Sequence, residues 1–169
     1  MRNVLVTGVS MGLGHGFARA LLEDGERVYG LSRREPEDLP GMIFRAMDLA
    51  DFDAVPGELS RLLDGLSRLD LLILNAGVLG EIRDMRESPL ADLKNVMDVN
   101  LWSNKVLLDA IFESGIVVTQ VVAISSGAAV NGNRGWSGYS ISKAAFLMMM
   151  KLYAAEASET HFSSFAPGL

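Results

Sequence analysis

The sequence predicts a doubly wound α/β fold of the Rossmann type, in which helices cover both faces of a parallel sheet. Short apolar runs alternate along the chain with longer segments whose apolar residues recur at helical spacing. The short runs are rich in Val, Leu and Ile and are apolar on both sides, as expected of parallel strands buried on both faces. Alternation of strands with helices implies right-handed crossovers, which build such a sheet.

The expected elements follow one another without a long interruption. The predicted strands are Val4–Thr7, Arg27–Leu31, Met42–Ala46, Leu69–Leu74, Val117–Ile124 and His161–Ala166. The predicted helices are Gly12–Asp24, Phe52–Leu66, Leu90–Phe112 and Ser137–Ser158. The most loop-like stretch, Glu35–Pro40, follows the second strand. Because no internal repeat, low-complexity tract or linker is found, we expect one domain over residues 1–169.

Composition excludes several classes of protein. Hydrophobic residues make up 49% of the chain and charged residues 21%, as in ordinary soluble globular proteins. The net charge of −6 and the lack of a basic run argue against a nucleic-acid partner. The chain has no Cys, which excludes disulfides, thiolate zinc sites and a cysteine nucleophile. No apolar run approaches the ~18 residues of a membrane span or the core of a signal peptide. We therefore expect a cytoplasmic protein without a membrane partner.

A glycine-rich turn follows the first predicted strand. In Thr7–Gly14, the glycines Gly8, Gly12 and Gly14 would let the backbone turn sharply and approach a pyrophosphate at the N-terminus of the next helix. Their spacing, Gly-x-x-x-Gly-x-Gly, differs from the usual Gly-x-Gly-x-x-Gly dinucleotide fingerprint. The alternative is an ordinary tight turn between a strand and a helix.

The end of the second predicted strand bears on the choice of cofactor. An acidic residue there would bind the ribose 2′-hydroxyl of NAD(H), whereas an Arg accommodates the 2′-phosphate of NADP(H). This chain has Ser32 followed by Arg33, and a guanidinium suits bidentate contact with a phosphate. The sequence therefore favours NADP(H) over NAD(H), the alternative being a solvated basic turn.

A phenol and an ammonium lie four residues apart at the start of the last predicted helix. Tyr139 and Lys143 would share one face of that helix. A nearby cation favours the phenolate, so Tyr139 becomes a candidate acid and base for a carbonyl or alcohol. Ser126 follows an apolar strand at the sheet edge where ligands bind, and its hydroxyl is a candidate contact for the substrate oxygen. The alternatives are a chance helical spacing and a turn or capping serine.

These features together resemble the motifs of the short-chain dehydrogenase/reductase family. The motifs that carry the resemblance, in order and spacing, are Thr7–Gly14, Asn75–Gly77, Asn100, Ser126, Tyr139-x-x-x-Lys143 and Pro167-Gly168. They run along the entire chain. The resemblance implies an NADP-dependent oxidoreductase that transfers a hydride between nicotinamide and a small carbonyl or alcohol.

The resemblance also implies roles for individual residues. Tyr139 would be the general acid and base, assisted by Lys143, Ser126 and Asn100, the last of which would organise a proton-relay water. Lys143 would also hold the ribose of the nicotinamide, and Asp48 looks like the family's adenine-contacting acid. The implied cofactor-binding residues are Gly8, Ser10, Gly12, Leu13, Gly14, Arg33, Asp48, Leu49, Asn75, Ala76, Gly77, Tyr139, Lys143, Pro167 and Gly168.

Two departures from the family pattern are visible. Leu74 stands where the family usually has a further Asn, which affects packing more than chemistry. Met11 stands where many NADP-dependent members have a basic residue, which counts against a simple NADP assignment.

Three stretches narrow the resemblance to one branch of the family. Asn75–Gly80, Ser125–Ala129 and Arg134–Tyr139 are similar to the branch of sepiapterin reductase and bacterial benzil reductase, which uses NADPH on vicinal dicarbonyls. The substrate expected on this ground is a small carbonyl, with a vicinal dicarbonyl as the finer expectation. The alternative is that Trp136 simply packs at the start of the helix.

Family members continue beyond the position of Leu169 with a substrate lid, a further helix and a last strand. We therefore expect the chain to be incomplete at its C-terminus, with an open sheet edge near His161–Ala166. The predicted helices Leu90–Phe112 and Ser137–Ser158 resemble those that pack family subunits together, which implies a homodimer or homotetramer. Phe146–Met150 is expected in the core or on that dimer surface.

Two other functional classes remain as alternatives. The chain could be a non-catalytic nucleotide-binding or interaction module that truncation has inactivated. Retention of both Tyr139 and Lys143 favours an enzyme. A nucleotide-sugar epimerase is disfavoured by the glycine spacing and the short length.

Overall fold

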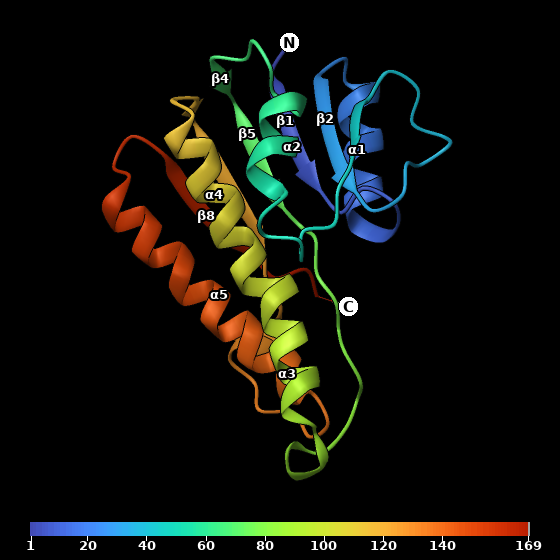
Figure 1. Ribbon diagram of the computed structural model, residues 1–169, viewed down its shortest axis with the longest axis vertical. Helices are drawn as coiled ribbons and strands as arrows, with labels where there is room; N and C mark the ends of the chain where they lie inside the picture. Colours follow the sequence, from blue (N-terminus) through green and yellow to red (C-terminus); the bar gives the residue numbers. More distant parts are fainter. Residues whose placement is uncertain (169) are drawn as a thin grey trace.

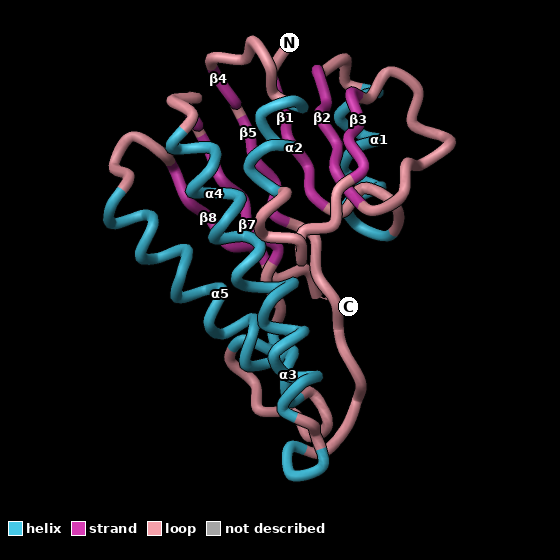
Figure 2. The backbone as a smooth tube through the Cα atoms, in the orientation of Figure 1, coloured by secondary structure: helices cyan, strands magenta, loops and turns pink. Residues whose placement is uncertain are grey.

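The computed structural model describes residues 1–168 and contains a six-stranded parallel sheet (Figures 1 and 2). The strands of this sheet, in spatial order, are β3 (Ile43–Ala46), β2 (Arg27–Ser32), β1 (Asn3–Thr7), β5 (Leu71–Leu74), β7 (Gln120–Ile124) and β8 (His161–Phe165). Two short strands, β4 (Arg68–Leu69) and β6 (Val117–Val118), pair with each other in a second parallel sheet. The chain winds outward from β1 in one direction and then returns to continue in the other. The predicted doubly wound α/β fold is confirmed.

Helices cover both faces of the sheet. They are α1 (Gly12–Glu23), α2 (Val55–Leu62), α3 (Leu90–Met97), α4 (Ser103–Glu113) and α5 (Ser137–Glu156). Figure 1 shows α2, α4 and α5 in front of the sheet and α1 behind it. The sheet has one apolar core on each face, and successive residues of β1 point to opposite cores. Leu5 packs toward α2, α4 and α5, whereas Val4 and Val6 pack toward α1.

Two predicted strands are each divided in the structure. The predicted strand Leu69–Leu74 is interrupted at Asp70, whose carboxylate accepts a hydrogen bond of 2.8 Å from the backbone N–H of Asn3. The predicted strand Val117–Ile124 is interrupted at Thr119, whose N–H donates to the carbonyl of Leu69. In both places the chain passes from the small sheet to the large one. A continuous apolar run in the sequence does not predict this change of sheet.

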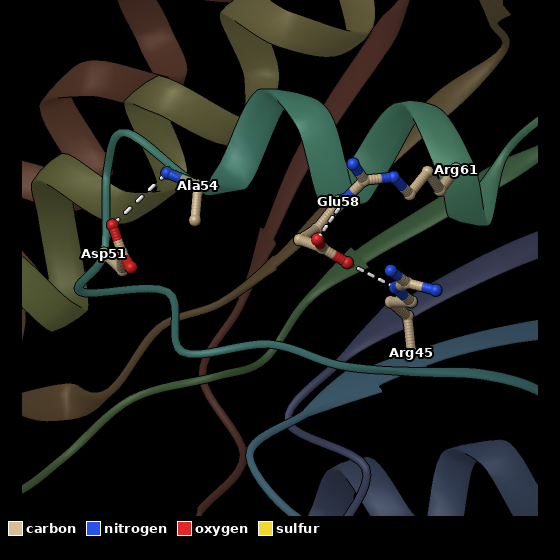
Figure 3. Close-up of polar contacts among 5 residues, drawn as sticks. All are labelled: Arg45, Asp51, Ala54, Glu58 and Arg61. Carbon is tan, nitrogen blue, oxygen red and sulfur yellow. Dashed lines mark hydrogen bonds and ion pairs between the residues drawn. The ribbon is translucent and has the colours of Figure 1, made fainter.

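The predicted helix Phe52–Leu66 is shorter in the structure, where α2 spans Val55–Leu62. A turn precedes it, in which the N–H of Ala54 donates to the side chain of Asp51 (Figure 3). Pro56 in the first turn of the helix and Gly65 after it, with φ +70°, suit these two ends.

Glu58 forms ion pairs with Arg61 on the same helix and with Arg45 on β3, which ties α2 to the edge of the sheet (Figure 3).

The predicted helix Leu90–Phe112 is also divided, because a π-helical turn spans Asp98–Trp102 between α3 and α4. Side chains after the turn bond back to carbonyls four residues earlier: Ser103 Oγ donates to Val99 at 2.6 Å, and Asn104 Nδ2 donates to Asn100 at 3.0 Å. Such turns are rare and frequently mark functional sites.

The remaining elements agree with the prediction to within two residues at each end. β8 is an edge strand, as expected, and its Phe165 is 54% exposed. Within the expected core or dimer segment, Phe146, Met149 and Met150 lie in the core while Met148 is exposed. Within residues 1–168, no helix has the length and apolarity that crossing a membrane requires.

Candidate active site

A single cleft of about 540 Å³ collects most of the residues that the sequence singled out. It lies at the carboxyl ends of the strands, at the point between β1 and β5 where the winding reverses, which is where open parallel sheets bind their ligands. The predicted residues that line it are Gly8, Ser10, Leu13, Arg33, Asp48, Leu49, Asn75, Ala76, Gly77, Ser126, Tyr139, Lys143 and Pro167. Its volume suits a molecule of cofactor size.

The glycine turn and the Asn75 motif form one closely packed unit. Gly8 has φ +76°, and a Cβ there would lie 2.9 Å from the Cα of Ala76. A Cβ on Gly14 would lie 2.3 Å from the carbonyl oxygen of Gly8, so neither position accepts a larger residue. Asn75 Nδ2 donates to the carbonyls of Thr7 and Gly8, and Thr7 Oγ1 accepts from the N–H groups of Asn75 and Ala76.

The turn leads into the N-terminus of α1 beside the cleft. Gly12 has φ +63°, a left-handed conformation that favours glycine, although Gly12 itself does not line the cleft. Met11 precedes the helix and makes no capping bond from its side chain. The first N–H groups of α1 are therefore available to an anion such as a pyrophosphate, which fits a dinucleotide in this cleft.

The ends of β2 and β3 supply the polar residues at the adenosine end of the predicted site. Ser32 is buried, and its hydroxyl donates to the carbonyl of Arg34 at 2.6 Å. Arg33 lines the cleft with an exposed side chain. Asp48 is also exposed, and its carboxylate accepts from the N–H of Ala50, while the neighbouring Leu49 is buried. A guanidinium and a carboxylate thus lie at the cleft positions expected to contact the 2′-phosphate and the adenine.

Lys143 lies almost completely buried beneath the cleft. Only 5% of the residue is exposed, and its Nζ donates to the carbonyl oxygen of Ile124 at 2.7 Å. Burial penalises the ammonium and lowers the pKa of Lys143 to about 8. Nζ lies 5.7 Å from the centre of the Tyr139 ring and 5.5 Å from that of Phe146. The two groups of the predicted catalytic pair are therefore neighbours, with the cation next to the phenol ring.

Tyr139 and Trp136 form the wall of the cleft at the start of α5. Their rings meet edge to face, with centres 5.7 Å apart and planes inclined by 68°. Such a contact stabilises both rings in one relative orientation. Tyr139 is half-buried, so its ring is held in protein while one side faces the cleft.

Ser126 combines the two roles that the sequence left open. It precedes the 3₁₀ turn Gly127–Ala129, and its Oγ accepts a hydrogen bond of 3.2 Å from the N–H of Ala128. It also lines the cleft together with Tyr139. Because the capping bond uses a lone pair of Oγ, the hydroxyl proton stays free to be donated to a substrate oxygen.

Asn100 lies behind the cleft and not on its surface. It is 1% exposed, and its Oδ1 accepts from the N–H of Val78 at 2.7 Å. Its Nδ2 donates to the carbonyl of Val78 and to Ser142 Oγ. The side-chain amide therefore fixes the backbone after Gly77 and the helix turn before Lys143, and the relay water remains a prediction.

Sequence reasoning missed Ser142. This residue is fully buried, accepts from Asn100 and donates to the carbonyl oxygen of Tyr139 at 2.8 Å. A hydroxyl residue three positions after Tyr139 inside a helix is the signal that was available, since such side chains commonly bond back to an earlier carbonyl. Of the other predicted residues, Gly168 does not line the cleft.

Comparison with known proteins identifies the family. The sequence profile of the short chain dehydrogenase family matches residues 2–169. The chain belongs to this family, and it is an oxidoreductase of that class.

Several relatives are similar along the whole chain. It is 28% identical to a benzil reductase ((S)-benzoin forming) of Bacillus cereus, in an alignment that covers 100% of this chain and 76% of that protein. It is 30% identical to the Bacillus subtilis benzil reductase ((S)-benzoin forming), covering 100% of this chain and 74% of the relative. The chain thus spans about three quarters of the length of these relatives.

Solved structures agree with the fold. The Shigella flexneri short chain dehydrogenase superimposes with a TM-score of 0.89 and 26% identity, covering 99% of this chain and 72% of that one. A structure from Escherichia coli CFT073 complexed with NADPH has a TM-score of 0.89 and 27% identity, covering 99% of this chain and 76% of that one.

Proposed function

We propose that the protein is an NADPH-dependent carbonyl reductase, with a small carbonyl compound, in the finer proposal a vicinal dicarbonyl, as substrate. The observation that carries the proposal is the convergence of Tyr139, Lys143 and Ser126 on the cleft that also contains Arg33. The names of the similar benzil reductases support a dicarbonyl, and the NADPH complex of a similar structure supports the cofactor. We infer that residues 1–169 form one Rossmann-type cofactor-binding and catalytic domain.

The chemistry divides between the cofactor and the side chains. The hydride that reaches the carbonyl carbon comes from the nicotinamide when NADPH is bound, since no side chain supplies one. Tyr139 gives its phenolic proton to the carbonyl oxygen, which yields the alcohol. Ser126 donates a hydrogen bond from its hydroxyl to the same oxygen as negative charge develops there. In the reverse direction the Tyr139 phenolate removes the proton from the alcohol.

Lys143 supports Tyr139 through its charge. Its ammonium lies next to the phenol ring, where it can stabilise the negative charge that forms on the Tyr139 oxygen as the proton leaves. The pKa of Lys143, lowered to about 8 by burial, leaves the ammonium mainly charged at pH 7. Asn100 and Ser142 act as positioning residues, because their hydrogen bonds hold the helix turn that carries both groups.

An NADPH oxidation assay with a panel of diketones tests the proposal. We expect oxidation of NADPH with vicinal diketones such as benzil, and slower oxidation with monoketones of similar size. Tight binding of NADPH without oxidation by any carbonyl in the panel would instead support the non-catalytic nucleotide-binding module.

Arg33 should set the preference between the two cofactors. We expect NADP(H) to bind more tightly than NAD(H), and Arg33→Ala to narrow the difference by ~1–3 kcal/mol through loss of a charge-assisted contact with the 2′-phosphate. Titration of both cofactors into each variant measures this. Arg34→Ala is the matched control, because Arg34 is also exposed but does not line the cleft. Equal affinities of the wild-type protein for the two cofactors would contradict the assignment.

The protein should associate through the outer faces of α4 and α5, giving the proposed homodimer or homotetramer. Ile141, Met148 and Leu152 lie seven and four residues apart on α5, hence on one helix face, and each is 45–56% exposed. Exposed apolar stripes of this kind mark protein interfaces. Sedimentation should show a species heavier than the 18.2 kDa chain, and Met148→Glu should shift it toward the monomer. A single species of monomer mass throughout the micromolar range would oppose this proposal.

A further inference from the structure

Two loops meet beyond the carboxyl ends of the strands, at the end of the cleft where Tyr139 lies. One follows β5 and covers residues 78–89; the other precedes α5 and covers residues 130–136 (Figure 1). Arg83 and Trp136 form a parallel β-bridge, in which the N–H of Arg83 donates to the carbonyl of Gly135 at 2.9 Å. Ser88 and Ser137 bond to each other through their hydroxyls at 2.8 Å. The loops are therefore joined along their length.

Two glycines of these loops lie in close contacts with neighbouring side chains. Gly135 has φ +88°, and a Cβ there would lie 2.9 Å from Cγ2 of Ile82 on the other loop. Gly80 has φ +73°, and a Cβ there would lie 2.7 Å from Cγ2 of Val96 on α3. Glycine at position 135 lets the two loops approach closely, and glycine at position 80 lets the first loop pass close to α3.

An ion pair joins the loops at the same point. Arg134 donates twice to Asp84, from Nε to Oδ1 at 2.7 Å and from Nη2 to Oδ2 at 2.5 Å. This two-bond geometry fixes direction as well as distance. The Arg134 guanidinium also holds the pKa of Asp84 below its usual value, so the carboxylate is charged at neutral pH. The Arg134 side chain is 87% exposed, so the pair should contribute little to global stability.

Trp136 connects this ion pair to the proposed active site. It follows Arg134 by two residues, its backbone takes part in the bridge to Arg83, and its ring packs against Tyr139. Both rings line the cleft. A movement of residues 134–136 would therefore change the cleft wall next to the phenol.

We propose that the Asp84–Arg134 ion pair positions Trp136 against Tyr139, which makes Asp84 and Arg134 positioning residues for carbonyl reduction. The inference rests on the proposed function for its kinetic consequence. Its structural part, the position of Trp136, is independent of any reaction. Small displacements matter at such a place, because a shift of about 1 Å in a reacting group can cost about 100-fold in rate.

The kinetic test compares two single variants and one exchange of charges. Arg134→Gln and Asp84→Asn should each lower kcat/KM for the diketone about 10-fold, mainly through kcat, because misplaced groups cost rate more than binding. The affinity for NADPH should stay within about twofold, because neither residue lines the cofactor cleft. The double variant Asp84→Arg with Arg134→Asp should regain at least half of the lost activity. Wild-type kinetics in both single variants would overturn the proposal, as would an exchanged pair that regains nothing.

The chain offers a matched control at the far side of the molecule. Glu58 pairs with Arg45 between α2 and β3, and neither lines the cleft (Figure 3). Glu58→Gln removes the carboxylate that pairs with Arg45 and Arg61, and it should leave kcat/KM unchanged within about twofold. An equal loss of activity in Glu58→Gln would show a general effect of stability and would overturn the positioning role.

Fluorescence of Trp136 tests the structural part without any turnover. In a Trp102→Phe background Trp136 is the remaining tryptophan of the chain. We expect Arg134→Gln to make this fluorescence at least twofold easier to quench with acrylamide, while Glu58→Gln leaves it unchanged. Unchanged quenching in Arg134→Gln overturns the inference, whether or not activity falls. If no carbonyl is reduced at all, the proposed function fails and this measurement alone decides the inference.

Discussion

Replacing Tyr139 with Phe should lower the rate of carbonyl reduction by about 10²–10⁴-fold, the usual contribution of a general acid. The substitution keeps the ring, its edge-to-face contact with Trp136 and its place beside Lys143, and removes only the phenolic proton. NADPH affinity should change little. Single-turnover rates at saturating NADPH measure the effect on the chemical step directly.

Tyr153 provides the matched control on the same helix. Its hydroxyl donates to Asp109 at 2.5 Å, and burial together with this carboxylate raises the pKa of Tyr153. Tyr153→Phe loses a hydrogen bond to a charged group, which should lower the free energy of unfolding by about 1.5–3 kcal/mol, while the rate stays near wild type. Tyr139→Phe should show the opposite pattern, with stability changed by about 1 kcal/mol or less. A Tyr139→Phe protein with a normal rate would end the proposed mechanism.

Much of the fold could be predicted because parallel strands leave a simple pattern. Val4, Leu5 and Val6 are all buried although they point to alternating faces, so a run without polar residues already indicates a strand covered on both sides. The glycine turn was also visible, because Gly8 and Gly14 are positions where any side chain would collide with backbone. Burial on both faces and the steric need for glycine each constrain individual residues, so they can be recognised position by position in the sequence.

The parts that escaped prediction depend on contacts between distant residues. The π turn at Asp98–Trp102 lies where the side chain of Asn100 forms hydrogen bonds with both Val78 and Ser142. The spacing of apolar residues in this part of the sequence does not predict the turn. The division of the strand at Asp70 depends on Asn3, which lies 67 residues earlier. The candidate site was predicted from residue types, but the sequence did not distinguish Asn100, which lies behind the cleft, from Ser126, which lines it.

The position of Lys143 implies a conflict between stability and activity. Burial lowers the pKa of this ammonium from 10.5 in the unfolded chain to about 8 in the folded protein. Between these values the unfolded chain binds more protons, so the free energy of unfolding should rise as the pH increases through this window. The pKa difference corresponds to about 3 kcal/mol, the cost at pH 7 of keeping the charge buried. As Lys143 loses its charge above pH 8, kcat/KM should fall.

Lys143→Met should therefore stabilise the protein at pH 7 while abolishing turnover. Methionine fills a similar volume without a charge, so the buried-charge cost of about 3 kcal/mol disappears. Loss of the hydrogen bond from Nζ to Ile124 offsets this by about 1–2 kcal/mol, which leaves a net gain of about 1–2 kcal/mol. Above pH 10.5 the wild-type lysine is neutral in both states, and the variant should then be the less stable protein. Urea unfolding of both proteins at pH 7 and pH 11 measures the two differences.

Lys151→Met is the control, since Lys151 lies on the same helix with its side chain exposed. It should change the free energy of unfolding by no more than about 0.5 kcal/mol at either pH and leave turnover near wild type. If Lys143→Met retained the wild-type rate, the ammonium would have no part in the reaction. If its stability relative to wild type were the same at pH 7 and pH 11, folding would not lower the pKa of Lys143. Gain of stability together with loss of turnover is the result expected of a lysine kept in the core for its charge.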